Sequence, residues 1–230
     1  MESEEIKKMI NQALDLQRKG EWEKGLKLLQ EAEGKTKLLP ENESKPLMGQ
    51  IRHTESRILQ AMGKHIEADQ KYREAKEIRR EDLIQFGYTV FQIFLNKEYA
   101  GIPIKSYEIK ETKVAIWQWA DAIKNPKELG DVFQNLAYIE QKQGDIKKAI
   151  WLYQVAEVFR GIANDKRGFG LTWARLGECY RQIGEDQKAQ EYGKKALKYF
   201  EEIGDSERIR QVKENIFGEG QLSRGDEQEG

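Results

Sequence analysis

A small-residue template recurs along this chain and constrains its fold more than any other feature. Gly144 is followed by Ala149 after five residues and by Ala156 after twelve. The same spacing recurs after Gly184 (Ala189, Ala196), after Gly63 (Ala68, Ala75) and, with small residues at both places, after Gly20 (Gly25, Ala32). Four copies of one template predict an internal structural repeat.

The template predicts a helical hairpin. The glycine ends the first helix, because a left-handed backbone conformation costs a residue without a Cβ the least. The two small residues lie two turns apart on one face of the second helix, so the first helix can approach closely. Larger residues between them, such as Tyr72 and Tyr153, would fill the space to the next hairpin.

The first helix of one hairpin carries a stripe of its own. Trp173, Leu176, Gly177 and Tyr180 follow at spacings that place them on one helical face. At the matching places one repeat earlier stand Phe133, Leu136 and Ala137, with Glu140 instead of the tyrosine. The pattern Trp-x2-Leu-Gly-x2-Tyr followed by Gly, Ala and Ala resembles the tetratricopeptide repeat (TPR) family.

The intervals between the anchoring glycines are longer than is usual for that family. The resemblance covers 127–203, 45–80 and 2–36, in decreasing order of match. Gly144 and Gly184 are 40 residues apart, against a family period of about 34, which is typical of the long-repeat branch. The 81 residues from Gly63 to Gly144 leave room for one degenerate hairpin without an anchoring glycine. Its helices are expected over 81–97 and 106–124, with a break at Gly101-Ile102-Pro103 and with Ala115 and Ala122 as its small residues.

The resemblance implies an all-α fold, a right-handed superhelical stack of about five hairpins (a TPR-like α-solenoid). We expect one repeat domain over 1–217, with hairpins at about 2–36, 45–80, 81–124, 127–164 and 167–203. A helix over 205–217, with Ile209, Val212 and Ile216 on one side, would cap the stack. The polar tail, 218–230, is expected to be disordered.

Charge and composition argue against two classes of partner. The net charge is −1, from 39 basic and 40 acidic residues, whereas binding to nucleic-acid phosphates usually requires a basic excess. The N-terminus, Met1-Glu2-Ser3-Glu4-Glu5, is acidic where a signal peptide is basic, and no apolar run approaches the ~20 residues that cross a bilayer. We therefore expect a cytoplasmic protein without a nucleic-acid or membrane partner.

The sequence contains no catalytic, cofactor or metal motif that we can identify. His53 and His65 lie on different predicted helices, with no Cys or His at metal-ligand spacing. The single cysteine, Cys179, is expected to be a buried structural thiol. The cluster Gly168-Phe169-Gly170 follows no strand, so it is not a phosphate loop. We predict that the chain is not an enzyme and needs no cofactor or metal.

The resemblance implies that the first helices line a concave groove that holds a segment of a partner protein. The residues that map to this groove are Gln134, Asn135, Tyr138, Gln141, Arg175, Glu178 and Arg181. An asparagine beside two arginines would suit a partner carboxylate or its backbone. The alternative is that the arginines pair with nearby glutamates and bind no ligand.

The first hairpin is expected to present Ile10, Asn11 and Leu14 to the groove. One subgroup of the family grips a chaperone's C-terminal carboxylate with a lysine and an asparagine in the first repeat and an asparagine in the second. Ile10 and Leu14 stand at the first two of these places and Thr54 at the third, which disfavours a chaperone-cofactor role.

Two tryptophans offer another surface. Trp117 and Trp151 each follow an alanine of their hairpin, Ala115 and Ala149, by two residues. We expect this position to be buried between second helices. Exposure would instead make the indoles a candidate interface on the convex side.

The sequence thus predicts an adaptor or scaffold protein. The alternative is a regulatory protein of the TPR type that responds to a peptide or small ligand, as some bacterial long-repeat proteins do. The partner's identity and the formation of a homo-oligomer are left open by the sequence.

Overall fold

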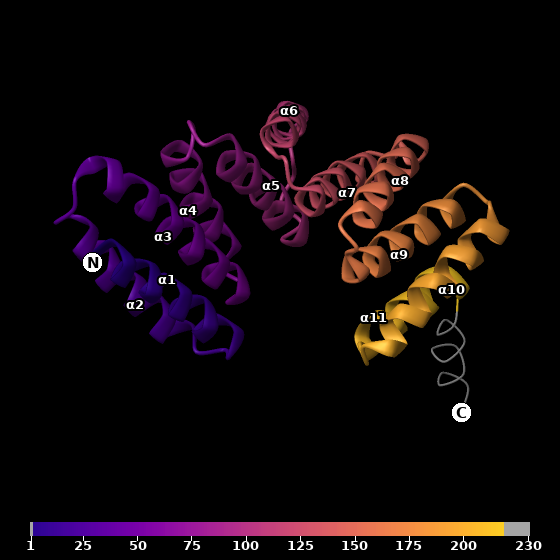
Figure 1. The fold of residues 1–230 in the computed structure, drawn as a ribbon, viewed down its shortest axis with the longest axis horizontal. Helices are drawn as coiled ribbons and strands as arrows, with labels where there is room; N and C mark the ends of the chain where they lie inside the picture. The colour runs from indigo at the N-terminus through magenta and orange to yellow at the C-terminus, as the bar shows by residue number, and fades with distance from the viewer. Residues whose placement is uncertain (1, 219–230) are drawn as a thin grey trace. The chain divides into compact units, whose positions relative to one another are not determined.

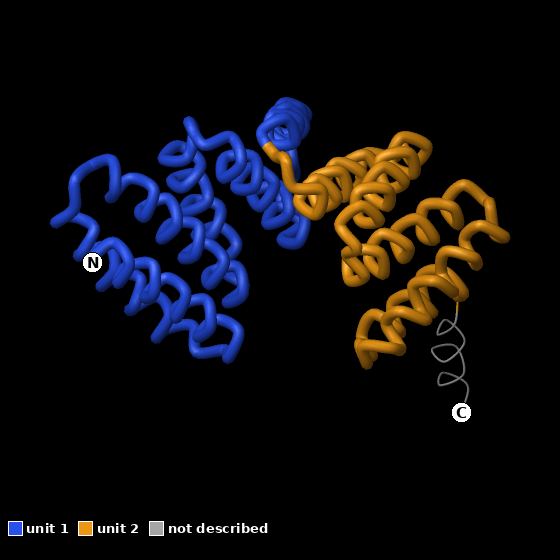
Figure 2. The backbone as a smooth tube through the Cα atoms, in the orientation of Figure 1, with its two compact units in different colours: residues 1–122 blue, residues 123–230 orange. Residues whose placement is uncertain are grey.

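The computed structural model describes residues 2–218, and every regular element in that part of the chain is a helix. Figure 1 shows the helices in chain order, and Figure 2 shows the two compact units into which the chain divides, residues 1–122 and 123–230. The repeat pattern predicts one continuous domain over 1–217. The division follows Ala122, where α6 ends, and each unit has buried apolar residues of its own.

Unit 1 contains three helical hairpins and unit 2 contains two. The hairpins of unit 1 are α1 (Glu2–Arg18) with α2 (Trp22–Thr36), α3 (Glu41–Ala61) with α4 (His65–Ile78), and α5 (Leu83–Tyr99) with α6 (Ser106–Ala122). Those of unit 2 are α7 (Pro126–Lys142) with α8 (Ile146–Ile162), and α9 (Lys166–Gln182) with α10 (Asp186–Glu202). An all-α fold of about five hairpins is confirmed, although α3 begins four residues before the predicted hairpin start.

The anchoring glycines end the first helices as predicted. Gly20, Gly63, Gly144 and Gly184 have φ values of 76°, 75°, 83° and 77°. These values lie in the left-handed region, where a Cβ would be strained. The small residues that follow are buried, with Ala68, Ala149 and Ala156 at 0% exposure.

The degenerate hairpin does have an anchoring glycine, contrary to the sequence prediction. Gly101 has a φ of 65° and follows the end of α5. It went unrecognised because residues 102–105 intervene before α6, whereas one residue separates the other anchors from their second helices. The longer connection shifts the register of α6, so Ala122 is exposed, while Thr112, Ala115 and Ile116 are buried.

Aspartate and asparagine side chains cap the N-termini of several helices. The side chain of Asn125 accepts a hydrogen bond of 3.0 Å from the backbone N–H of Lys127, and Pro126 is the first residue of α7, as predicted. Asp145 and Asp165 accept bonds of 3.2 and 3.1 Å in the same way at the starts of α8 and α9. These caps satisfy N–H groups that have no partner within the helix.

A half-buried carboxylate joins α4, α5 and α6 of unit 1. One oxygen of Glu108, on α6, accepts hydrogen bonds from Lys97 Nζ (2.7 Å) and Arg73 Nη2 (3.2 Å). The other accepts one of 3.0 Å from the backbone N–H of Lys105. Burial alone would raise the pKa of the Glu108 carboxyl, but the bonds from Lys97 and Lys105 outweigh it and lower the pKa to about 2.

Replacing Glu108 by glutamine is expected to lower the free energy of unfolding by about 2 kcal/mol at neutral pH. The carboxyl of the unfolded chain titrates near its ordinary value of 4.5, and that of the folded chain near 2. The stabilisation is therefore full above pH 4.5 and is lost as the pH falls towards 2. Urea unfolding across this range should show a shallower pH dependence in E108Q, and an unchanged slope would contradict the assignment.

The last helix caps unit 2 against α9 and α10. The predicted capping helix consists of α11 (Ser206–Val212) and a single π-helical turn (Lys213–Phe217). Val212 and Ile216 are buried, and Ile209 is half-buried. The predicted disordered tail lies outside the described residues except for Gly218.

The two tryptophans are exposed, so the expectation of burial is wrong. Trp117 is 42% exposed and Trp151 is 54% exposed. They also do not occupy equivalent positions, because the register of α6 differs from that of α8: Trp117 lies eleven residues after the start of α6 and Trp151 five after the start of α8.

None of the helices in residues 2–218 combines the length and the apolar character that crossing a membrane requires.

Candidate functional site

The predicted partner-binding residues lie on α7 and α9, the two first helices of unit 2, which contact each other directly. The structure assigns them different roles. Some form hydrogen bonds inside the unit, others contact the C-terminal cap, and the rest form a half-buried polar surface.

Gln134 belongs to an internal network around Arg160. Arg160, on α8, is 1% exposed. Its Nη1 donates to Asp165 (2.6 Å), its Nη2 to Asp131 (2.9 Å) and Gln134 (3.1 Å), and its Nε to Thr172 (3.1 Å). Gln134 also accepts a hydrogen bond of 2.9 Å from Thr172. Its carbonyl oxygen therefore joins α7, α8 and α9 and is not available to a partner.

Unit 1 contains a related arginine with fewer partners. Arg79, 81 residues before Arg160, is 7% exposed and donates to Thr89 Oγ1 (2.8 Å). Gln50 stands where unit 2 has Asp131, so the corresponding carboxylate is missing. Burial lowers the pKa of Arg79 to about 10, since the nearby Asp82 offsets the loss of hydration only in part.

Gln141 is also used internally. Its Oε1 accepts a hydrogen bond of 3.0 Å from the hydroxyl of Tyr153, which is fully buried on α8. In unit 1, Gln60 accepts a bond of 3.1 Å from Tyr72 in the same way. This tyrosine–glutamine pair is a repeated structural feature of the hairpins, because a buried hydroxyl needs a partner.

Tyr138 and Arg175 connect the two first helices. The Arg175 guanidinium lies 5.3 Å from the centre of the Tyr138 ring, a cation–π distance, and its Nη1 donates to Glu178 (2.8 Å). Burial would lower the pKa of Arg175, but the Glu178 carboxylate more than offsets this, so the pKa is raised and the group stays charged. Arg175 therefore does pair with a nearby glutamate, as the alternative reading expected, but through one of its nitrogens, Nη1.

Glu178 and Arg181 contact the C-terminal cap. Glu178 Oε1 accepts a hydrogen bond of 3.1 Å from the Asn215 amide, and Arg181 Nη1 donates to the Asn215 carbonyl oxygen (2.9 Å). No sequence pattern predicts these bonds, because only the apolar residues of the capping helix follow a periodic pattern.

Asn135 differs from these residues. It is half-buried on α7, and its side chain forms no hydrogen bond with any residue from 2 to 218. We call Asn135, Tyr138, Arg175 and Glu178 the first-helix face of unit 2. It offers an amide, a guanidinium and an aromatic ring within two adjacent helices, groups that recognise carboxylates and peptide backbone.

The first hairpin does not present the surface expected of it. Ile10 is 4% exposed and belongs to the apolar core of unit 1, although Asn11 is exposed and Leu14 is half-buried. Thr54 is 4% exposed, and its hydroxyl donates to the carbonyl oxygen of Gln50 in its own helix. Neither Ile10 nor Thr54 is available to a ligand.

The histidines and the cysteine pack within unit 1 and unit 2, respectively. His53 is buried beside Tyr72 and Tyr88, and the ring of His65 lies 2.9 Å from the Asn96 amide oxygen. Cys179 is fully buried, and burial raises the pKa of its thiol to about 12, which disfavours a reactive thiolate. No three His, Cys, Asp or Glu side chains within 2–218 are close enough to share a metal ion.

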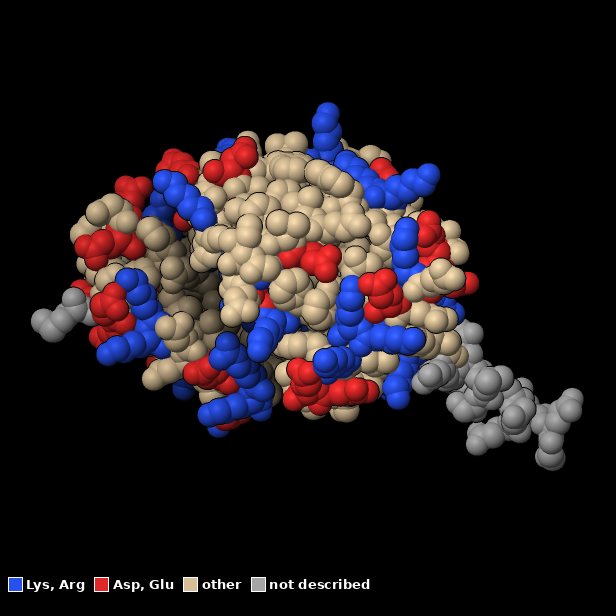
Figure 3. Space-filling view, turned by 45° about the vertical axis from the view of Figure 1, so that its right-hand side comes forward, with Lys and Arg blue, Asp and Glu red and all other residues tan. Residues whose placement is uncertain are grey.

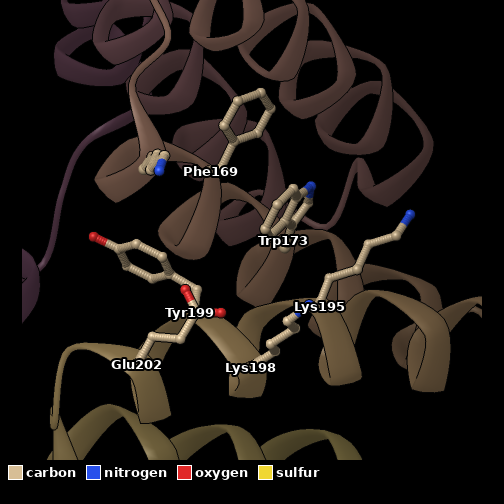
Figure 4. A pocket seen from close by; sticks show the side chains of 7 residues that line it. Phe169, Trp173, Lys195, Lys198, Tyr199 and Glu202 are labelled. Atoms are coloured by element: carbon tan, nitrogen blue, oxygen red, sulfur yellow. The ribbon is translucent and has the colours of Figure 1, made fainter.

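A pocket between α9 and α10 was not predicted from the sequence. Figure 4 shows Phe169, Trp173 and Tyr199 at this pocket, together with lysine side chains. Its residues lie on the second helix, α10, and on the side of α9 away from Arg175. The predicted groove consists of first-helix residues on the other side, so it does not include them. Elsewhere, basic and acidic side chains are interspersed on the face shown in Figure 3.

Solved structures provide the comparison that decides the fold. The chain is similar to BtubC from P. vanneervenii (TM-score 0.71, 16% identity, 88% of this chain and 82% of that chain). It is also similar to a kinesin light chain-like protein with TPR-like repeats from Podosopora anserina (TM-score 0.61, 16% identity, 93% and 97%).

A third similar structure is a signal transduction ATPase with a tetratricopeptide repeat sensor from Pyrococcus horikoshii (TM-score 0.68, 22% identity, 89% of this chain and 31% of that chain). The chain has the tetratricopeptide-repeat fold. No protein-family model and no curated protein sequence matches it. The likeness to these solved structures therefore lies in the hairpin fold.

Proposed function

We propose that this TPR chain is a non-catalytic adaptor or scaffold that binds a segment of a partner protein on the first-helix face of unit 2. The observation that carries the proposal is the Tyr138–Arg175 pair across α7 and α9, with the unbonded Asn135 amide one turn away. An arginine held over an aromatic ring keeps its remaining N–H groups in a fixed orientation, which favours binding to a carboxylate or backbone carbonyl.

TPR folds in general bind protein partners, which supports this class of function over others. The surface charges of the chain are balanced, and phosphate recognition would need a basic excess. The cytoplasmic location expected from the sequence stays a prediction.

In affinity capture from a lysate, the double variant Asn135→Ala/Arg175→Gln is expected to capture about tenfold less of the partner than the native chain does. Arg181 is left unchanged, because its bond to Asn215 supports the cap. The control Lys147→Gln/Gln190→Ala makes equivalent changes at exposed positions of α8 and α10. Circular dichroism must first show equal helix content in all three proteins.

Loss of one protein with the first variant and its retention with the control would support the proposal. Equal retention of the same proteins by both variants would contradict it and exclude the first-helix face as the docking surface.

A further inference from the structure

The α9/α10 pocket has a volume of about 260 Å³. It is lined by Lys166, Phe169 and Trp173 from α9, and by Lys195, Lys198, Tyr199 and Glu202 from α10. Figure 4 shows the aromatic rings and the lysine side chains around one opening. Typical small-molecule pockets have volumes of roughly 300–1,000 Å³, so this one suits a single large side chain better than a whole ligand.

The neighbouring hairpin of the same unit shows what fills this position when it is closed. Phe133 and Phe159 stand 40 residues before Trp173 and Tyr199. The two phenyl rings stack with centres 5.4 Å apart and planes 3° from parallel. The α7/α8 hairpin thus closes this position with two parallel rings.

The two rings of the α9/α10 hairpin face other partners. Trp173 stacks on Phe169 with ring centres 5.0 Å apart, and its indole N–H donates to Glu157 of α8 (2.7 Å). Tyr199 makes an edge contact with Phe200 at 5.5 Å. Trp173 and Tyr199 therefore do not stack on each other. The pocket between α9 and α10 lies at the position that Phe133 and Phe159 fill in the α7/α8 hairpin.

The residues at the rim of the pocket also differ between the two hairpins of unit 2. On α8 the corresponding residues are Val155, Val158 and Ile162, whereas α10 has Lys195, Lys198 and Glu202. Lys195 pairs with Glu191 at 2.7 Å. Lys166 and Lys198 form no ion pair within residues 2–218, so their charges are available to an anion.

We propose that the α9/α10 pocket binds an acidic peptide segment of another protein, whose aromatic side chain inserts against Trp173 and Tyr199. The inserted ring would replace the stacking that Phe133 and Phe159 provide in the neighbouring hairpin, and carboxylates beside it would pair with Lys166 and Lys198. This site is separate from the first-helix face, because Arg175 lies two residues after Trp173, on the far side of α9.

The test measures binding of a fluorescein-labelled peptide, Gly-Ser-Glu-Glu-Phe-Glu-Glu-Gly-Ser, by fluorescence anisotropy with the full chain at low ionic strength. The variant Lys166→Glu/Lys198→Glu is expected to raise the Kd by about tenfold or more. The control Lys147→Glu/Lys194→Glu makes the same charge change at exposed lysines of unit 2 outside the pocket, and its Kd should change less than threefold.

Two further comparisons test the aromatic part. Replacing the peptide's phenylalanine by alanine should raise the Kd by about tenfold. Replacing both rings by phenylalanine, Trp173→Phe/Tyr199→Phe, copies the pair that closes the α7/α8 hairpin and should raise the Kd by about tenfold or more with unchanged helix content.

The proposal would be overturned if the native chain fails to bind the peptide at millimolar concentration. Equal loss in the pocket variant and in the Lys147/Lys194 control would also overturn it, because binding would then follow net charge alone. Equal affinity for the phenylalanine and alanine peptides would remove the aromatic component and with it the assigned site.

Discussion

Replacing Arg160 by methionine is expected to lower the free energy of unfolding of unit 2 by about 3–5 kcal/mol. Methionine can fill the space of the aliphatic stem, but it leaves Asp165, Gln134 and Thr172 without the donor that they share. The Asp165 side chain is 9% exposed, so its carboxylate would remain buried without its ion pair. The measurement is urea unfolding followed by circular dichroism.

Arg79 provides the matched control in unit 1. Its one hydrogen bond within residues 2–218 is to Thr89, and burial lowers its pKa because no carboxylate pairs with it directly. Arg79→Met is therefore expected to change stability by less than about 1 kcal/mol, or to stabilise the unit. Equal losses for the two substitutions would show that the carboxylates around Arg160 contribute nothing measurable.

Replacing Gly87 by alanine is expected to destabilise unit 1 by about 3 kcal/mol. A Cβ on Gly87 would lie 2.7 Å from Trp119 Cβ and 2.8 Å from the Ala115 carbonyl oxygen. Both atoms lie on or next to the backbone of α6, so relief requires α5 and α6 to move apart. The midpoint of thermal unfolding, followed by circular dichroism, should fall accordingly.

Gly34 in α2 is the control for this substitution. A Cβ added there meets no atom within 4 Å, and the residue is exposed in a helix. Gly34→Ala should stabilise the chain by roughly 0.5–1 kcal/mol, because alanine favours the helix more than glycine does. If both substitutions have the same effect, the close approach of α5 to α6 is not the cause.

The hairpins could be predicted from the sequence because stacking constrains particular residues. A glycine with positive φ and buried small residues at fixed distances recur wherever two helices must approach closely, as at Gly144 and Ala149. The fixed spacing failed at Gly101, because four residues follow it before α6 begins. The pattern depends on loop length as well as on residue type. The predicted register of α6 and the predicted burial of Trp117 were therefore wrong.

The site was harder to predict, because side-chain partners are set by tertiary contacts between helices far apart in the sequence. Gln134 and Arg160 are 26 residues apart, and nothing in their spacing signals a shared hydrogen bond. Comparing the repeats with one another carries more information. The change from Val155 and Val158 to Lys195 and Lys198 is visible in the sequence once the hairpins are aligned, and it marks the α9/α10 pocket.

The most direct test of the proposed function is photo-crosslinking from the first-helix face. Benzoylphenylalanine is placed at position 135 in one protein and at position 147 in a second, and each is irradiated in a lysate of the source cells. We expect that one protein crosslinks from position 135 and not from position 147, and that Arg175→Gln reduces the yield of this crosslinked product. Crosslinking of the same proteins from both positions, or from position 147 alone, would contradict it.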